Sequence, residues 1–343
     1  MKELPRNRIL VGDARQRLAS LPGGSVDCVV TSPPYFALRN YAMAGQLGLE
    51  ATVTEWVDDL LAVMDELARL LKPAGTLWLN LGDSYSRREH QGAPPKGLLL
   101  APERLLLALA NRGWVVRNKI VWAKTNPLPM SAADRLTCAW EPLYLLTRSR
   151  HYHFDLDAIR QPHRSSRPPS RSKPPRSGPP AWAGPLAGNQ SGLDRLHAQG
   201  AAGHPLGKNP GDVWTLPTAA SRTGHHASFP EGLIHRPILA GTPERVCATC
   251  GLAWRRQRVT RSLGRLAVIG GLRPDCACGS DYRPGLVLDP FIGSGTVAVV
   301  AERLGRDWLG IELNPAFADM AMRRLQVARR MKRHQDSSDA AAA

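Results

Sequence analysis

The feature that most restricts the fold of this chain is a glycine-rich turn between a buried strand and a helix near the C-terminus. Residues 286–289 (LVLD) form a short apolar run typical of a buried parallel strand, and a helix is predicted at residues 296–304. Gly293 and Gly295 lie between them and allow the backbone to approach a ligand closely. In open α/β sheets, ligands bind where a strand ends and its helix begins. The segment therefore predicts an α/β sheet with a ligand site at this turn.

The chemistry of the turn favours a nucleoside ligand that carries no pyrophosphate. No lysine follows the glycines, which excludes the phosphate loop of nucleotide hydrolases, and the third glycine of the dinucleotide pattern is missing. Glu312 ends the next predicted strand, at residues 307–312, where an acidic side chain can bind both hydroxyls of a ribose. S-Adenosylmethionine is a ligand of this kind. A purely structural strand-to-helix turn is the alternative.

The rest of the chain alternates predicted strands with predicted helices. Short apolar runs rich in β-branched residues indicate strands, and apolar residues at three- and four-residue spacing indicate helices. Further strands are predicted at residues 8–12, 26–31, 76–81, 114–123 and 142–147, and helices at residues 55–71, 102–112 and 315–333. The strands at 114–123 and 142–147 are expected to be antiparallel neighbours. The alternation predicts a mostly parallel sheet with helices on both faces.

A second candidate site directly follows the strand at residues 26–31, in the sequence Thr31-Ser32-Pro33-Pro34-Tyr35. The prolines fix the backbone and remove two N–H donors. The Ser32 hydroxyl and the Pro33 carbonyl could then both accept hydrogen bonds from one amino group, and Tyr35 offers an aromatic face. This would suit a planar base that is flipped out of a duplex so that its amine attacks an activated methyl group. A rigid turn with a buried tyrosine is the structural alternative. No Gly-x-Ser-x-Gly elbow surrounds Ser32, which argues against a serine hydrolase.

Four of the six cysteines occur as two close pairs near the C-terminus: Cys247, Cys250, Cys276 and Cys278. Their spacing favours a structural zinc site with four thiolate ligands in a reducing compartment rather than disulfides. Four unliganded cysteines in a loop are the alternative. The segment between the pairs could present arginines to DNA, namely Arg255, Arg256, Arg258 and Arg261.

The charge of the chain points to a polyanionic partner. The formal net charge is +16, and residues 161–208 are rich in proline, serine, glycine and arginine. This segment is either a solvated linker or an arm that lies on phosphates, and both interpretations stay open. There is no apolar stretch long enough to cross a membrane and no apolar signal core, so a cytoplasmic protein without membrane contact is expected.

The two motifs, in this order, resemble those of the β-type DNA amino-methyltransferases. Further similar segments are Gly12-Asp13, residues 118–124 (NKIVWAK), Trp140-Glu141 and residues 226–231 (HASFPE). The resemblance covers roughly residues 7–160 and 209–328. It implies a Rossmann-like methyltransferase sheet of about seven strands with a circularly permuted motif order, an inserted recognition region, a zinc-ribbon-like insert and S-adenosylmethionine as cofactor.

The resemblance also implies roles for individual residues. The target base is expected to be held by Ser32, Pro33, Pro34 and Tyr35. The cofactor is expected to be held by Asp289, Phe291, Gly293, Gly295, Thr296, Glu312, Phe229, Glu231 and Asp13. Serine in the first motif position favours cytosine N4 as the methylated atom, with adenine N6 as the alternative. A non-catalytic zinc-containing DNA-binding regulator on the same fold and a methyltransferase for RNA or small molecules are further alternatives.

The expected partner is double-stranded DNA, with a cognate restriction endonuclease as a further candidate; monomer and dimer both stay open. The expected organisation is a catalytic half at 1–160, a flexible insert at 161–208 and a pre-cofactor motif at 209–242. A zinc-ribbon-like insert at 243–284, a cofactor-binding half at 285–333 and a disordered tail at 334–343 follow. Cys28 is expected in the core, and Asp83 either contacts substrate or caps a turn.

Overall fold

The computed structural model divides into two compact units. It describes residues 4–163, 204, 206–219, 229–257, 259–260, 266–267 and 271–342. The larger unit comprises Met1–Asp155, Gly211–Val246 and Tyr282–Ala343, and the smaller unit comprises Leu156–Pro210 and Cys247–Asp281. No helix within the described part of the chain is both long and apolar enough to span a bilayer.

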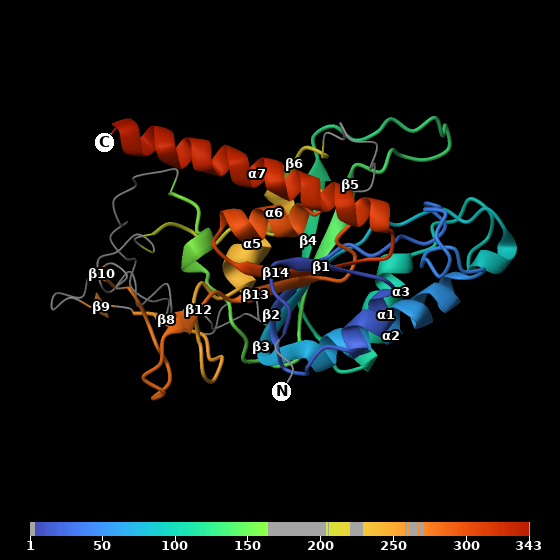
Figure 1. Ribbon diagram of the computed structural model, residues 1–343. Coiled ribbons are helices and arrows are strands. Elements are labelled where there is room, and N and C mark those ends of the chain that lie inside the picture. Colours follow the sequence, from blue (N-terminus) through green and yellow to red (C-terminus); the bar gives the residue numbers. More distant parts are fainter. Residues whose placement is uncertain are drawn as a thin grey trace, which may run out of the picture. The chain divides into compact units, whose positions relative to one another are not determined.

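An eight-stranded mixed sheet forms the centre of the larger unit (Figure 1), in the order β1-β14-β13-β2-β3-β5-β4-β6. Neighbouring strands from β1 to β3 are parallel, whereas β5 is antiparallel to both β3 and β4, as expected for the latter pair. The short edge strand β6 was not predicted and accounts for the eighth strand. The strands are β1 (Arg8–Val11), β2 (Val26–Thr31), β3 (Leu71–Asn80), β4 (Val115–Lys124), β5 (Trp140–Thr147), β6 (Val213–Leu216), β13 (Leu286–Asp289) and β14 (Asp307–Glu312).

The strand order brings the two ends of the chain together. The C-terminal strands β13 and β14 lie between β1 and β2, and β13 pairs with β2 through Val287 opposite Cys28. A buried carboxylate, Asp27 on β2, links the neighbouring strands β3 and β13. Lys72 Nζ lies 2.6 Å from its Oδ1, and the backbone N–H of Leu286 donates to its Oδ2 at 2.9 Å. The predicted α/β fold with permuted motif order is confirmed.

Helices cover both faces of the sheet (Figure 1). The alternation of side chains along β3 separates the two faces. Leu77 and Leu79 join the core cluster that includes α2, whereas Trp78 lies beside Gly241 of α5. On the first side α2 contacts α1 and α3, and on the second α6 contacts α5 and α7. The helices are α1 (Ala14–Ala19), α2 (Val53–Leu70), α3 (Ala101–Asn111), α5 (Glu231–Gly241), α6 (Thr296–Arg303) and α7 (Pro315–Ala342), with a 3-10 turn at Glu89–Gln91.

Four helices, α1, α2, α5 and α7, differ from the expectation. Helix α2 begins two residues earlier than predicted, because Thr52 and Glu55 form a capping box at its start. The short helix α1 and the proline-containing helix α5 were not predicted. Helix α7 continues to Ala342, through positions where we expected a disordered tail. Alanine, which ends the sequence, is the strongest helix former.

The smaller unit contains short antiparallel pairs. Strand β8 (Arg255–Arg256) pairs with β11 (Leu272–Arg273), and β9 (Val259–Thr260) pairs with β10 (Leu266–Ala267). A 3-10 turn covers Asp157–Ile159, and an isolated bridge joins Gln161 and Lys208. The chain passes between the units at β7 (Val246–Cys247) and β12 (Tyr282–Arg283). Several predicted features lie outside the described residues: most of the insert at 161–208, residues 226–228 of the HASFPE segment, and Arg258 and Arg261.

Candidate active site

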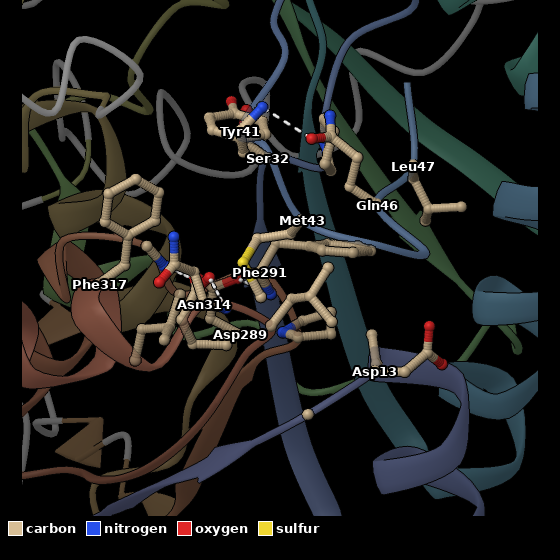
Figure 2. Close-up of a pocket in the computed structure, with 18 of the residues that line it drawn as sticks. Asp13, Ser32, Tyr41, Met43, Gln46, Leu47, Asp289, Phe291, Asn314 and Phe317 are labelled. Atoms are coloured by element: carbon tan, nitrogen blue, oxygen red, sulfur yellow. Dashed lines mark hydrogen bonds between the residues drawn. The ribbon is translucent and has the colours of Figure 1, made fainter. Parts of the chain in front are cut away.

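A cavity opens at the carboxyl ends of the parallel strands (Figure 2). It contains about 940 Å³ of empty space, including its open mouth. The residues that follow β1, β2, β13 and β14 reach it together because parallel strands end at one edge of the sheet. The predicted site residues that line it are Asp13, Ser32, Pro34, Phe229, Asp289, Phe291, Gly293, Thr296 and Glu312.

Asp289 ends β13 at the floor of the cavity. Its Oδ1 accepts hydrogen bonds from Thr31 Oγ1 at 2.7 Å and from the backbone N–H of Phe291 at 3.0 Å. The residue is 1% exposed, and this burial raises the pKa of its carboxyl to about 7. Asp289 thus fixes the turn to the neighbouring strand and places a titratable group near neutrality beside the cavity.

Glu312 ends β14 and holds the glycine-rich turn. Its Oε2 accepts from the backbone N–H of Gly293 at 2.9 Å, and its Oε1 accepts from that of Asn314 at 2.9 Å. A carboxylate oxygen can accept more than one hydrogen bond, so each oxygen can also accept from a ribose hydroxyl. Burial raises the pKa of Glu312. These acceptor oxygens therefore fit the ribose hydroxyls of a nucleoside.

Gly295 shapes the turn without lining the cavity. Its φ is +78°, which favours glycine, and a Cβ at this position would lie 2.9 Å from Ala321 Cβ on α7. The residue caps the N-terminus of α6. Close packing of α7 on the turn therefore requires glycine here.

Aromatic and apolar side chains that the sequence did not point to complete the cavity. Tyr41 and Phe317 lie edge to face, with ring centroids 6.2 Å apart. Met43 and Leu47 form part of the apolar wall of the cavity (Figure 2). Gln46 folds this segment back, because its Oε1 accepts from the Tyr41 N–H at 2.7 Å. The segment has no helix or strand periodicity; its position soon after the Ser-Pro-Pro-Tyr motif was the only available signal.

Some residues of the Ser-Pro-Pro-Tyr motif line the cavity, and the others support those that do. Ser32 and Pro34 line the cavity, whereas Pro33 and Tyr35 do not. The Pro34 carbonyl accepts from Trp56 Nε1 at 3.0 Å, which fixes the turn on α2. The Tyr35 ring packs so closely on Gly82 that a Cβ there would lie 2.4 Å from Tyr35 Cε2.

Two further expected cofactor residues have structural partners. Glu231 does not line the cavity; its carboxylate forms ion pairs with Arg303 at 2.8 Å and Arg324 at 2.9 Å. Arg324 also donates to Thr296 Oγ1 at 2.8 Å. Glu231 is therefore linked to the glycine-rich turn indirectly, through Arg324. Asp13 caps α1 and forms an ion pair with Arg15 at 3.2 Å.

The structure decides between the two interpretations of Asp83 and confirms the position of Cys28. The Asp83 carboxylate accepts from the backbone N–H groups of Leu100 at 2.9 Å and Ala101 at 3.1 Å, so it caps the start of α3. Cys28 is fully buried, and burial raises the pKa of its thiol to about 12.

The four predicted metal ligands come together within the smaller unit. The sulfur atoms of Cys247, Cys250, Cys276 and Cys278 all lie within 4.8 Å of one another. Gly251, with φ +71°, turns the chain so that its N–H donates to the Cys247 carbonyl at 2.9 Å. Four converging thiols with no other ligand type fit a closed tetrahedral zinc site. Of the arginines in this segment, Arg255 pairs with Asp275 at 2.6 Å.

Comparison with known proteins finds similarity along most of the chain. A family model described as a DNA methylase, of the N6/N4 type, matches residues 26–323. The type II methyltransferase M.SmaI of Serratia marcescens is 32% identical over 93% of this chain and 90% of its own length.

Two solved structures share the fold. The cytosine-N4-specific PvuII DNA methyltransferase matches with a TM-score of 0.56 and 18% identity, over 93% of this chain and 86% of that one. A putative DNA modification methylase from Thermus thermophilus, in complex with S-adenosyl-L-methionine, matches with a TM-score of 0.53 and 23% identity, over 94% and 93%.

Proposed function

Since this chain belongs to the N6/N4 family of DNA methylases, we propose that it methylates the exocyclic N4 amine of cytosine in double-stranded DNA. The chain is an S-adenosylmethionine-dependent DNA methyltransferase. The finer assignment, which concerns the base and the residues that serve it, rests on the chemistry of the cavity.

One observation carries the proposal: Ser32 and the turn at Gly293 line the same cavity. An amine held by the Ser32 hydroxyl would therefore lie beside a methyl group carried by a cofactor in that turn. The two groups would react without further assembly, so positioning supplies much of the rate.

S-Adenosylmethionine supplies an activated methyl group on a sulfonium. The residues proposed to hold it are Glu312 at the ribose hydroxyls, Gly293 and Gly295 in the turn, Asp13, and aromatic contacts from Phe291 and Phe229. Thr296 and Glu231 both bind Arg324 and thereby fix the glycine-rich turn. Asp289 contributes a buried carboxyl where β13 enters this turn.

Cytosine N4 is favoured by Ser32, since serine in this motif position is commoner among enzymes of that specificity. The structural relative named for PvuII is also described as cytosine-N4-specific. Adenine N6 is the second candidate. The proposed acceptor for the amine is the Ser32 hydroxyl, since Pro33 does not line the cavity, and the Tyr35 hydroxyl supports Ser32 on the side away from the cavity.

Mass spectrometry of DNA from cells that express the protein tests this assignment. N4-methylcytosine in one sequence context is expected, and its level should fall sharply with Ser32→Ala. Appearance of N6-methyladenine alone would reverse the choice of base. Sequence-context mapping of the same DNA identifies the recognition site, and an adjacent endonuclease gene that cuts the unmethylated site would support a restriction partner.

We also propose that the four cysteines bind one structural zinc ion. Their sulfur atoms lie within 4.8 Å of one another, and thiolates at about 2.3 Å from zinc would meet this spacing. Elemental analysis of purified protein is expected to give one equivalent of zinc. Less than about half an equivalent would count against the site.

A further inference from the structure

Behind Ser32, a chain of hydrogen bonds leads away from the cavity to a carboxylate that does not line it. Ser32 Oγ lies 3.1 Å from Tyr35 Oη, and Tyr35 Oη lies 2.9 Å from Oε2 of Glu141 on β5. Lys124 on the adjacent strand β4 holds the other oxygen, with its Nζ 2.6 Å from Oε1. The side chains of this ion pair are only 16% and 17% exposed.

An amide from a third strand completes the contacts of Glu141. Asn80 Nδ2 donates to Glu141 Oε2 at 3.3 Å and to the Pro142 carbonyl at 3.0 Å, while its Oδ1 lies 3.2 Å from Tyr35 Oη. Glu141 thus faces one cation, Lys124, one phenol, Tyr35, and one amide. The aromatic ring of Tyr35 is fixed in turn by Gly82.

The ionised carboxylate dictates the direction of every hydrogen bond in the chain. A carboxylate can only accept, and Glu141 Oε2 lies nearer to Tyr35 Oη than Asn80 Oδ1 does, at 2.9 Å against 3.2 Å, so Tyr35 donates its single proton to Glu141. The Tyr35 oxygen can then only accept from Ser32, and the Ser32 proton is committed to it. Ser32 therefore presents lone pairs, and no proton, to the cavity. Burial and the Glu141 carboxylate raise the pKa of Tyr35 well above its usual value, which keeps the phenol protonated.

We infer that Glu141, fixed by Lys124, is a positioning residue and terminal proton acceptor that acts on the substrate amine through Tyr35 and Ser32. The inference rests on the proposed function, because it assigns the amine to Ser32. When the amine nitrogen bonds to the methyl carbon, the carbon–sulfur bond breaks and its electron pair stays on sulfur. One amine proton passes to Ser32 Oγ, the Ser32 proton to Tyr35 Oη, and the Tyr35 proton to Glu141 Oε2.

Single-turnover methyl transfer at saturating cofactor and neutral pH tests the relay with Glu141→Gln. This variant keeps the size of the side chain but cannot take the proton. A loss of about 10²-fold is expected, since general acid–base catalysis contributes about 10²–10⁴-fold. Cofactor affinity should change less than about twofold.

Glu103→Gln is the matched control. Glu103 forms an ion pair at 2.7 Å with Lys119, which lies on the same strand as Lys124 but outside the cavity. This variant should keep both the rate and the cofactor affinity of the wild type. Tyr35→Phe breaks the chain while keeping the ring, and it provides the test if Glu141→Gln does not fold.

A rate within about tenfold of wild type, or a reduced rate accompanied by an equal loss of cofactor affinity, overturns the relay. Product analysis of the wild type in the same assay separates the two claims. If the wild type forms no N4-methylcytosine, the proposed function fails; if it does and Glu141→Gln matches it, only the relay fails.

Discussion

Thr31 and Asp289 are 258 positions apart in the sequence, yet Thr31 Oγ1 donates a hydrogen bond to Asp289 Oδ1 at 2.7 Å. Each residue is the last of its strand, and the two strands are parallel neighbours. The loop after one strand carries Ser32, and the loop after the other carries Gly293. This contact thus brings the amine-binding motif and the cofactor motif to the same edge.

The buried carboxyl of Asp289 should make stability depend on pH. Its pKa is raised from 3.8 to about 7 by burial, so the folded protein binds this proton more tightly than the unfolded chain does. The stabilisation is complete below pH 3.8 and is lost as the pH rises through about 7, by at most about 1.4 kcal/mol per pH unit. Urea unfolding at several pH values should show this decline in wild type and not in Asp289→Asn. If the free energy of unfolding changed with pH in the same way in both proteins, the raised pKa of Asp289 would be contradicted.

Glu312→Gln should weaken cofactor binding. The amide would place an NH₂ against the N–H of Gly293 or Asn314, and it would lose the charge that accepts from ribose hydroxyls. Hydrogen bonds to charged groups contribute about 1.5–3 kcal/mol, which corresponds to about 10- to 150-fold in affinity. Calorimetry with S-adenosylhomocysteine measures the change. Glu302→Gln, whose carboxylate pairs with Arg329 away from the cavity, should bind like wild type.

Ser32→Ala should slow methyl transfer rather than weaken cofactor binding. Loss of one preorganised hydrogen-bonding group at a reacting centre typically costs about 10²–10³-fold in kcat. Rapid-quench kinetics with labelled cofactor provides the rate, and titration provides the cofactor affinity, which should stay within about threefold. Ser25→Ala removes an exposed hydroxyl that bonds only to the nearby Pro22 carbonyl and is the matched control. A similar loss in both variants would argue against a role for Ser32 in catalysis.

The main strands were predictable because their signals are local. Residues 26–31, 286–289 and 307–312 are apolar runs bounded by turn residues, and each is a strand with those bounds. Edge strand β6 has only four residues and alternates in burial, so its signal is weak. Helix α5 contains Pro237, which argues against a helix in sequence terms.

The chemical motifs were predictable, and the residues that support them were not. Ser32, Asp289 and Glu312 stand at strand ends beside proline- or glycine-rich turns, which is a local pattern. Glu141 reaches Tyr35 only because β5 runs beside β3, and no spacing in the sequence encodes that contact. Likewise Glu231 was assigned to the cofactor, yet its partners Arg303 and Arg324 follow it by 72 and 93 positions.

The metal cluster makes a prediction that is independent of catalysis. Cys250→Ser should lower bound zinc well below one equivalent, because a hydroxyl is a poor replacement for a thiolate ligand. Cys138→Ser removes an exposed cysteine outside the cluster and should leave the metal content unchanged. Elemental analysis of both variants measures their zinc content. Equal zinc in both would show that Cys250 is not a ligand.

Two glycines with similar backbones should respond differently to the same substitution. Gly295 and Gly305 have φ values of +78° and +67°, so alanine has a similar backbone cost at each. A Cβ at Gly305 meets no atom within 4 Å, whereas at Gly295 it lies 2.9 Å from Ala321 Cβ. Overpacking of this kind costs about 1–3 kcal/mol. Gly295→Ala should therefore unfold more easily than Gly305→Ala by about that amount in urea. It should also bind S-adenosylhomocysteine more weakly, because relief of the clash moves the turn that Glu312 holds. Equal stabilities would mean that α7 can shift away from the turn without cost, so that packing of this helix does not set the shape of the cofactor loop.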